Sequence, residues 1–123
     1  MTKILIADDQ PSIRSGLRLL VEQQPTLNVV GEIDSNDALL NWLRANKADI
    51  VLLDWESQGV PSHQIIPELK SIFPELKIIV LDSKPEIRQE AINAGASEFV
   101  SKNEPPERLL EVIASLTKDI KGE

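Results

Sequence analysis

Four residues of the chain carry side chains that could together hold a divalent cation and a phosphoryl group. Asp8 and Asp9 follow a short apolar segment, Asp54 closes a second one, and Lys102 follows a third. Carboxylates packed together repel one another, and burial raises their pKa values, unless a cation relieves the cost. Mg²⁺ prefers oxygen ligands and is commonly bound by one or two carboxylates together with a phosphate oxygen. These residue types predict a Mg²⁺ site next to side chains that bind a phosphoryl group.

The same residue types suit the transfer of a phosphoryl group to a carboxylate. An aspartate can act as a covalent nucleophile in such a reaction and form an acyl phosphate. Because the transferred group carries negative charge on its oxygens, positioning and charge neutralisation supply most of the catalysis. A lysine ammonium neutralises phosphate oxygens as a point charge. We therefore expect Asp54 to attack phosphorus in line while Mg²⁺ and Lys102 hold the phosphoryl group.

These side chains can meet only if strands and helices bring them to one place. Short apolar segments rich in β-branched residues predict five strands, at residues 4–7, 27–33, 49–54, 77–81 and 99–100. Between them, apolar residues at helical spacing predict five helices, with first residues or caps at Pro11, Ser35, Ser62, Pro85 and Pro105. The apolar stripe of the last helix is expected at Leu109, Ile113, Leu116 and Ile120.

The strict alternation of strands and helices predicts the fold class. Continuous apolar strands joined by helices indicate one α/β, doubly wound (βα)5 domain, with a five-stranded parallel sheet covered on both faces. The crossover connections should be right-handed. An open sheet of this kind places its site at the carboxyl ends of the strands, beside the point where the strand order reverses. The acids and the lysine, far apart in sequence, should converge at that edge.

Composition excludes several other kinds of protein. The chain has 123 residues, of which 41% are hydrophobic, so it is long enough for one domain with an ordinary core. The absence of cysteine excludes disulfides, thiolate zinc sites and thiol catalysis, and His63 has no second histidine with which to form a site. A net charge of −7 argues against nucleic acid binding through a basic face. We expect a cytoplasmic protein that binds no membrane.

Four segments of the chain together resemble the response-regulator receiver family, the CheY-like domains of two-component signal transduction. They are residues 4–9 (ILIADD), 51–54 (VLLD), 94–97 (AGAS) and 99–102 (FVSK), and the resemblance covers the whole chain. The resemblance implies the strand order 2-1-3-4-5. It also implies that residues 1–123 are one receiver domain with no output domain in this chain.

The resemblance assigns a role to each candidate residue. It implies that Asp8, Asp9 and Asp54 bind Mg²⁺ together with the backbone carbonyl of Glu56. It implies that Asp54 accepts a phosphoryl group from a histidine kinase or a histidine phosphotransfer protein, and that Lys102 contacts the phosphoryl oxygens. A protein of this kind is not an enzyme in the usual sense, because it catalyses only its own phosphorylation and dephosphorylation.

The resemblance also locates the surface that transmits the signal, on the fourth helix, fifth strand and fifth helix. Phe99 matches the switch aromatic of the family. The candidate surface residues are Arg88, Gln89, Ile92, Phe99 and Arg108. The downstream protein target is unknown, and a homodimer through this surface is compatible with the sequence.

The chain departs from the family pattern at three places. Where the family has Ser or Thr after the fourth strand, this chain has Asp82, or Ser83 if the strand is shifted by one residue. Asn103 replaces the usual proline after the lysine, and a cis bond before a non-proline residue would cost about 3–4 kcal/mol. Gln58 stands where a proline usually precedes the loop glycine.

Three other functions compete with the phosphorylatable switch. Asp82 would add negative charge near the phosphate, so the chain could be a receiver-like interaction module with weak or no phosphorylation. A small aspartate-based phosphohydrolase would need a second aspartate two residues after the nucleophile, where this chain has Glu56. A flavodoxin-like FMN binder would need a first loop that cradles phosphate, and residues 9–12 (DQPS) do not provide one.

Overall fold

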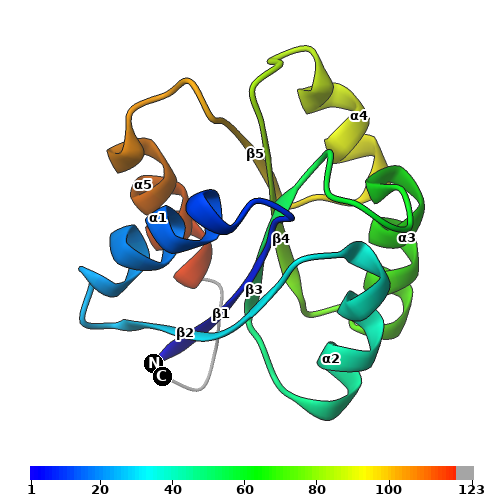
Figure 1. The fold of residues 1–123 in the computed structure, drawn as a ribbon, viewed down its shortest axis with the longest axis horizontal. Helices are drawn as coiled ribbons and strands as arrows, with labels where there is room; N and C mark the ends of the chain where they lie inside the picture. The colour runs from blue at the N-terminus through cyan, green and yellow to red at the C-terminus, as the bar shows by residue number, and fades with distance from the viewer. Residues whose placement is uncertain (119–123) are drawn as a thin grey trace.

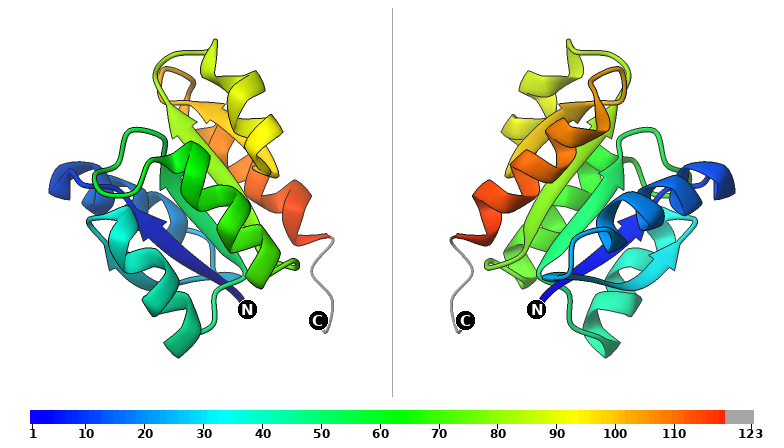
Figure 2. Two further views of the ribbon diagram at one scale, coloured as in Figure 1. Left: turned by 90° about the vertical axis from the view of Figure 1, so that its right-hand side faces the viewer. Right: turned by 90° about the vertical axis from the view of Figure 1, so that its left-hand side faces the viewer.

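The computed structural model describes residues 1–118 and shows the α/β architecture that the sequence predicts. The strands are β1 (Thr2–Ala7), β2 (Leu27–Ile33), β3 (Ile50–Asp54), β4 (Lys77–Asp82) and β5 (Glu98–Ser101). They form one parallel sheet in the order β2-β1-β3-β4-β5, so the expected order 2-1-3-4-5 is confirmed. The strands point the same way, away from the N-terminus, as the two side views of Figure 2 show.

The helices cover both faces of this sheet (Figure 1). They are α1 (Pro11–Glu22), α2 (Leu39–Ala45), α3 (Ser62–Ile72), α4 (Ile87–Ala94) and α5 (Pro106–Thr117), with a 3-10 turn, η1 (Asn36–Ala38), before α2. Helices α1 and α5 lie on one side, and α2, α3 and α4 lie on the other. The sheet is therefore buried on both sides, which is why its strands are apolar throughout rather than alternating.

Each face of the sheet has its own hydrophobic core. Leu5, Leu53 and Val80 belong to the cluster that meets α2, α3 and α4. Ile6 and Leu52 belong to the cluster that meets α1 and α5. Successive residues of a strand point to opposite faces, so the two clusters alternate along each strand. Asp54 continues the set of Leu52, which directs its side chain toward the α1 side of the sheet.

Most of the predicted helix ends are confirmed. Pro11 and Pro106 stand in the first turns of α1 and α5, where the missing amide hydrogen is tolerated. Gly95 ends α4 with a φ of 121°, a conformation that favours glycine. Ile120, the last residue of the predicted stripe on α5, lies outside the described residues.

Two predicted caps and one helix start need correction. The hydroxyl of Ser35 accepts a hydrogen bond from the amide of Asp37, so it caps η1 rather than α2. Ser62 is the first residue of α3, not its cap, because its hydroxyl is used by the preceding loop. Helix α4 begins at Ile87, two residues after the predicted Pro85, because residues 85 and 86 belong to a turn.

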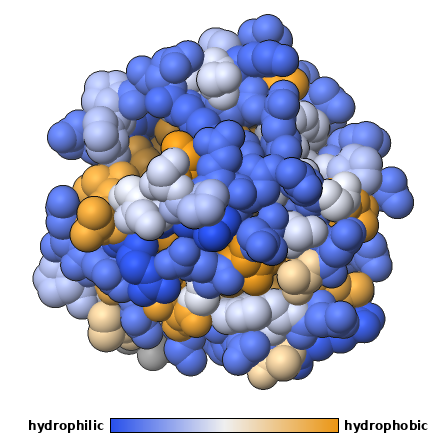
Figure 3. Space-filling view, viewed as in Figure 1, coloured by the Kyte–Doolittle hydropathy of each residue, from blue (hydrophilic) through white to orange (hydrophobic). Residues whose placement is uncertain are grey.

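The face of the molecule drawn in Figure 3 is largely polar. Hydrophilic residues cover most of the face seen in Figure 3, with small separate hydrophobic patches between them. No helix in the described part of the chain combines the length and the apolar character that crossing a bilayer requires.

Candidate metal and phosphoacceptor site

The sheet brings the three acids of the predicted site together. Asp8 directly follows β1, Asp54 ends β3, and these strands are neighbours in the sheet. One carboxylate oxygen from each of Asp8, Asp9 and Asp54 lies within 4.8 Å of the others. Asp8 and Asp54 are 1% and 4% exposed, so two of the three carboxylates are almost cut off from water. Two neighbouring parallel strands thus create the acidic cluster.

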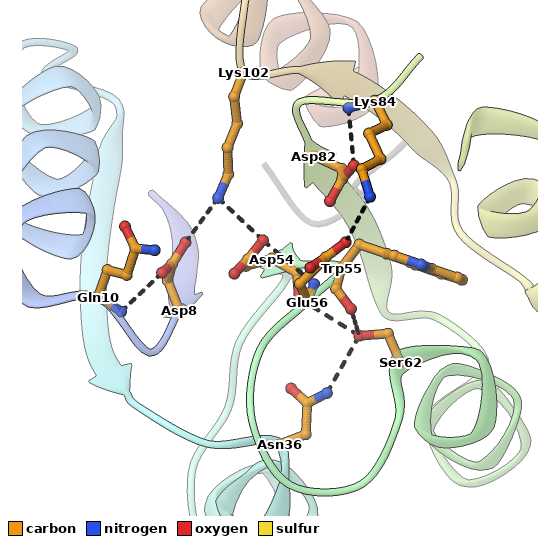
Figure 4. A network of polar contacts seen from close by, with 10 residues as sticks. All are labelled: Asp8, Gln10, Asn36, Asp54, Trp55, Glu56, Ser62, Asp82, Lys84 and Lys102. Atoms are coloured by element: carbon orange, nitrogen blue, oxygen red, sulfur yellow. Dashed lines mark hydrogen bonds and ion pairs between the residues drawn. The ribbon is translucent and has the colours of Figure 1, made fainter. Parts of the chain in front are cut away.

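Lys102 extends from the end of β5 across to this cluster, as Figure 4 shows. Its Nζ lies 3.0 Å from the Oδ1 of Asp54 and 3.5 Å from the Oδ2 of Asp8. The backbone amide of Lys102 donates to the carbonyl of Asp82, 2.9 Å away, which holds the start of its side chain against β4. The long side chain therefore crosses the end of β4 to reach Asp54 on β3.

Burial and charge shift the proton affinities of this site. Burial raises the pKa of Asp54, the hydrogen bond from Lys102 offsets part of the rise, and the charge of Asp8 adds to it. Burial alone would lower the pKa of Lys102, but its hydrogen bond to Asp54 and the charges of Asp54 and Asp8 outweigh this and raise it. The ammonium therefore stays charged beside the Asp54 carboxylate, whose ionised form is disfavoured by burial.

The donor set fits a hard divalent cation. Three carboxylates with oxygens this close suit Mg²⁺, which takes oxygen ligands and retains several waters. Lys102 supplies one positive charge against three acids, so the cluster has room for further positive charge. The resemblance also implies the backbone carbonyl of Glu56 as a ligand. The amide of Glu56 lies 3.4 Å from the Oδ1 of Asp54, and its carboxylate is exposed.

The structure distinguishes the two candidates for the position after β4. Asp82 is the last residue of β4, is 4% exposed, and accepts a hydrogen bond from the amide of Lys84 at 2.9 Å. Ser83 is exposed, and its carbonyl accepts a hydrogen bond from the side chain of Asn103. Asp82 is therefore the residue buried at the end of β4. The bond between Lys102 and Asn103 is trans, as are the other described peptide bonds.

Four of the five residues of the implied output surface, Arg88, Gln89, Ile92 and Phe99, lie on α4 and β5. Phe99 is 1% exposed, and the guanidinium of Arg88 lies 5.2 Å from the centre of its ring. Gln89 and Ile92 are exposed on α4. Arg108 on α5 pairs with two neighbouring glutamates of its own helix region rather than with α4.

Two groups of contacts were not predicted from the sequence. The guanidinium of Arg14 donates to the carbonyl of Asp8 at 2.6 Å and pairs with Glu32 at 3.4 Å. Its position one turn into α1, five residues after Asp9, was the available signal. The second group joins Asn36 to Ser62 and the loop after Asp54. No local pattern could reveal it, because 26 residues separate the two partners.

Comparisons with known proteins identify the family. The model of the response regulator receiver domain matches residues 4–114, so the chain belongs to this family. It is 29% identical over 118 residues to the response regulator UvrY of Escherichia coli O6:H1, covering 94% of this chain and 54% of that protein. The chain thus spans about half the length of the curated relatives it matches.

Solved structures agree with this assignment. The non-phosphorylated receiver domain of the stress response regulator RcsB from Escherichia coli has a TM-score of 0.88 at 32% identity, covering 96% of this chain and 94% of that one. The isolated receiver domain of RcsB from Salmonella enterica serovar Typhimurium, solved with the phosphomimetic BeF₃⁻, has the same score and identity, covering 95% and 88%. The receiver fold is therefore established for this chain.

Proposed function

We propose that this chain is a phosphoacceptor switch in a two-component phosphorelay, with Asp54 as the residue that takes the phosphoryl group. The observation that carries the proposal is the position of the Asp54 carboxylate, which lies in one cluster with Asp8 and Asp9 and has the ammonium of Lys102 3.0 Å from its Oδ1. A carboxylate in this setting faces both a cation site and a fixed positive charge. Both can neutralise a phosphoryl group.

The chemistry follows from these residues. Asp8, Asp9, Asp54 and the carbonyl of Glu56 would hold Mg²⁺, which supplies charge neutralisation to the phosphoryl oxygens when it is bound. An oxygen of Asp54 attacks phosphorus as the bond from phosphorus to the donor's histidine nitrogen breaks, and the electron pair stays with the imidazole. Lys102 balances the charge of the transferred group. Hydrolysis of the acyl phosphate returns the carboxylate, so the chain turns over only its own modification.

The donor in this proposal is a histidine kinase or a histidine phosphotransfer protein. The signal would leave through Phe99 and the exposed residues of α4 and α5, as a shift between two populations rather than a new fold. The downstream target is a protein, or a second copy of this chain, because a net charge of −7 disfavours contact with nucleic acid or an anionic membrane. The cytoplasm is the compartment in which such donors act.

The test is to incubate the protein with acetyl phosphate and Mg²⁺ and to follow its intact mass. We expect a gain of one phosphoryl group that disappears in Asp54→Asn and in the presence of a chelator. Asp34→Asn is the matched control, because Asp34 is an exposed aspartate that follows β2 and lies outside the acidic cluster. Asp34→Asn should be phosphorylated like the wild type.

The same experiment separates the competing functions. If the wild type binds Mg²⁺ but gains no phosphoryl group, the chain is a receiver-like interaction module, and the buried charge of Asp82 is the first candidate cause. Sustained hydrolysis of a phosphate ester would point to a phosphohydrolase. Phosphorylation at a residue other than Asp54 would overturn the proposal.

A further inference from the structure

The turn between β2 and α2 holds the loop that follows the acceptor. We call residues 55–61, which join β3 to α3, the acceptor loop. The amide of Asn36 donates to the carbonyl of Gln58 at 2.7 Å, and its Nδ2 donates to the carbonyl of Val60 at 2.8 Å. Asn36 is 1% exposed, so the residue that donates both bonds is itself buried. Buried polar groups are normally kept only with such partners, so turn and loop form one unit.

Ser62 extends this unit toward the acceptor. The Nδ2 of Asn36 also donates to the hydroxyl of Ser62 at 3.2 Å, and that hydroxyl donates to the carbonyl of Trp55 at 2.7 Å. Figure 4 shows the chain of contacts from Asn36 through Ser62 to the backbone of Trp55. Trp55 stands between Asp54 and Glu56, so the contacts reach the backbone that joins them. Ser62 is 2% exposed and makes these bonds inside the protein.

The middle of the acceptor loop is held at the same time. The carboxylate of Asp37 accepts a hydrogen bond from the amide of Val60 at 3.0 Å. Gly59 adopts a φ of 94°, and a Cβ there would lie 2.7 Å from the hydroxyl oxygen of Ser35. The loop and the turn therefore pack so closely that the loop backbone has little freedom. None of these turn residues belongs to the acidic cluster.

We infer that Asn36 and Ser62 are positioning residues for the cation site, because their hydrogen bonds hold the backbone at Trp55 and Gln58, on either side of Glu56. The inference rests on the proposed function, in which the Glu56 carbonyl is a ligand. A carbonyl on a freely moving loop must be ordered when the ion binds, and that ordering lowers affinity. Loss of residues that orient metal ligands commonly reduces affinity about 10- to 100-fold.

The experiment measures cation affinity directly, without phosphorylation. Mn²⁺ accepts the same oxygen ligands as Mg²⁺, and its free concentration is read by electron paramagnetic resonance. The full-length variants Asn36→Ala and Ser62→Ala should each bind Mn²⁺ about 10-fold more weakly than the wild type. Because both act through one chain of contacts, the double variant should lose less than the product of the two single losses.

Two controls separate positioning from general damage. Asn46→Ala removes the exposed residue after the end of α2, whose Nδ2 donates to the carbonyl of Trp42 in that helix rather than to the acceptor loop. Ile113→Val loosens the core on the opposite face of the sheet and lowers stability. Both should keep the wild-type affinity, measured where circular dichroism shows every variant fully folded.

Each outcome decides one of the two proposals. Unchanged affinity in Asn36→Ala and Ser62→Ala overturns the positioning role, as does an equal loss in Ile113→Val. If Asn36→Ala does not fold, Ser62→Ala decides alone, since it removes only one hydroxyl. A wild type that binds no Mn²⁺ contradicts the proposed cation site itself, which is a different failure from the first.

Discussion

Two loops border the carboxylate of Asp54, and the protein holds them in different ways. The acceptor loop is bound by buried side chains of Asn36 and Ser62 and packs tightly around Gly59. The loop of residues 83–86, which joins β4 to α4, is exposed along its length and is tied by contacts to Asp82 and Asn103 at its first residues. A surface ion pair between Lys84 and Glu56, 3.7 Å apart, is a direct link between the two loops.

Under the proposed function, the difference separates the two tasks of a phosphorylatable switch. The loop that follows Asp54 would keep the Glu56 carbonyl in position, and buried hydrogen bonds fix it. The loop that leads to α4 would respond to the state of Asp54, and exposed segments with few buried contacts open at low free-energy cost. The loop after β3 is therefore the more rigid of the two, and the loop after β4 is the one with more freedom to move.

The largest expected effect comes from a substitution at Gly59 in the acceptor loop. Gly59→Ala should lower the free energy of unfolding by about 2 kcal/mol, because its positive φ and the close contact with Ser35 both oppose a Cβ. Gly16→Ala is the matched control, since a Cβ there meets nothing within 4 Å and the site is in α1. It should raise stability by about 0.5–1 kcal/mol. Urea unfolding measures both, and equal effects would refute a tightly held loop.

The second prediction concerns Asp82, the buried acid that directly precedes the loop of residues 83–86. Asp82→Thr removes a negative charge and adds a hydroxyl, so phosphorylation by acetyl phosphate should speed up about tenfold. Two unit charges about 8 Å apart near a protein surface interact by roughly 2 kcal/mol, so the loss of one nearby charge is sufficient for an effect of this size. Asp82→Asn removes the charge without adding a hydroxyl and should give part of the gain. A slower rate in Asp82→Thr would show that the acid assists the reaction.

The third prediction tests how the ionised Asp54 carboxylate affects the stability of the folded protein. Because burial raises the pKa of Asp54, the folded protein binds this proton more tightly than the unfolded chain does. Stability contributed by the protonated form is therefore lost as pH rises from about 3.9 through the raised value. Without metal, Asp54→Asn should exceed the wild type in stability at about pH 7 by on the order of 1 kcal/mol.

Urea unfolding in chelator at about pH 4 and about pH 7 provides the check, since the advantage of Asp54→Asn should shrink toward the lower pH. Asp34→Asn, which changes an exposed aspartate, should show no such trend. An Asp54→Asn variant that is less stable than the wild type at both pH values would mean that the Lys102 interaction outweighs burial.

The smallest expected effect is on the link between the two loops. Lys84 and Glu56 are 61% and 60% exposed, so their coupling in a double-mutant cycle should stay below about 0.5 kcal/mol. Salt should reduce it further, because such exposed charges are screened. A coupling well above this value would mean that the loop of residues 83–86 is held more firmly than its exposure indicates.

Local patterns in the sequence predicted the elements well. Apolar segments marked the strands, Pro11 marked the start of α1, and Gly95 marked the end of α4, because each of these signals is carried by neighbouring residues. The caps at Ser35 and Ser62 were assigned wrongly, because a serine hydroxyl can satisfy several nearby partners. Ser35 accepts from the amide of Asp37 and so caps η1, while Ser62 donates to the carbonyl of Trp55 in the loop that precedes α3.

The sequence by itself determined which residue types stand at the strand ends, and with them the fold class, the receiver family and the candidate residues Asp8, Asp9, Asp54 and Lys102. Only the tertiary structure decided that Asp82 rather than Ser83 is buried at the end of β4, and that Asn36 is hydrogen-bonded to the acceptor loop. Periodicity and spacing are local properties, whereas burial and hydrogen-bond partners arise when the sheet brings residues from distant parts of the chain together. Residues 36 and 62 become neighbours only in the folded protein.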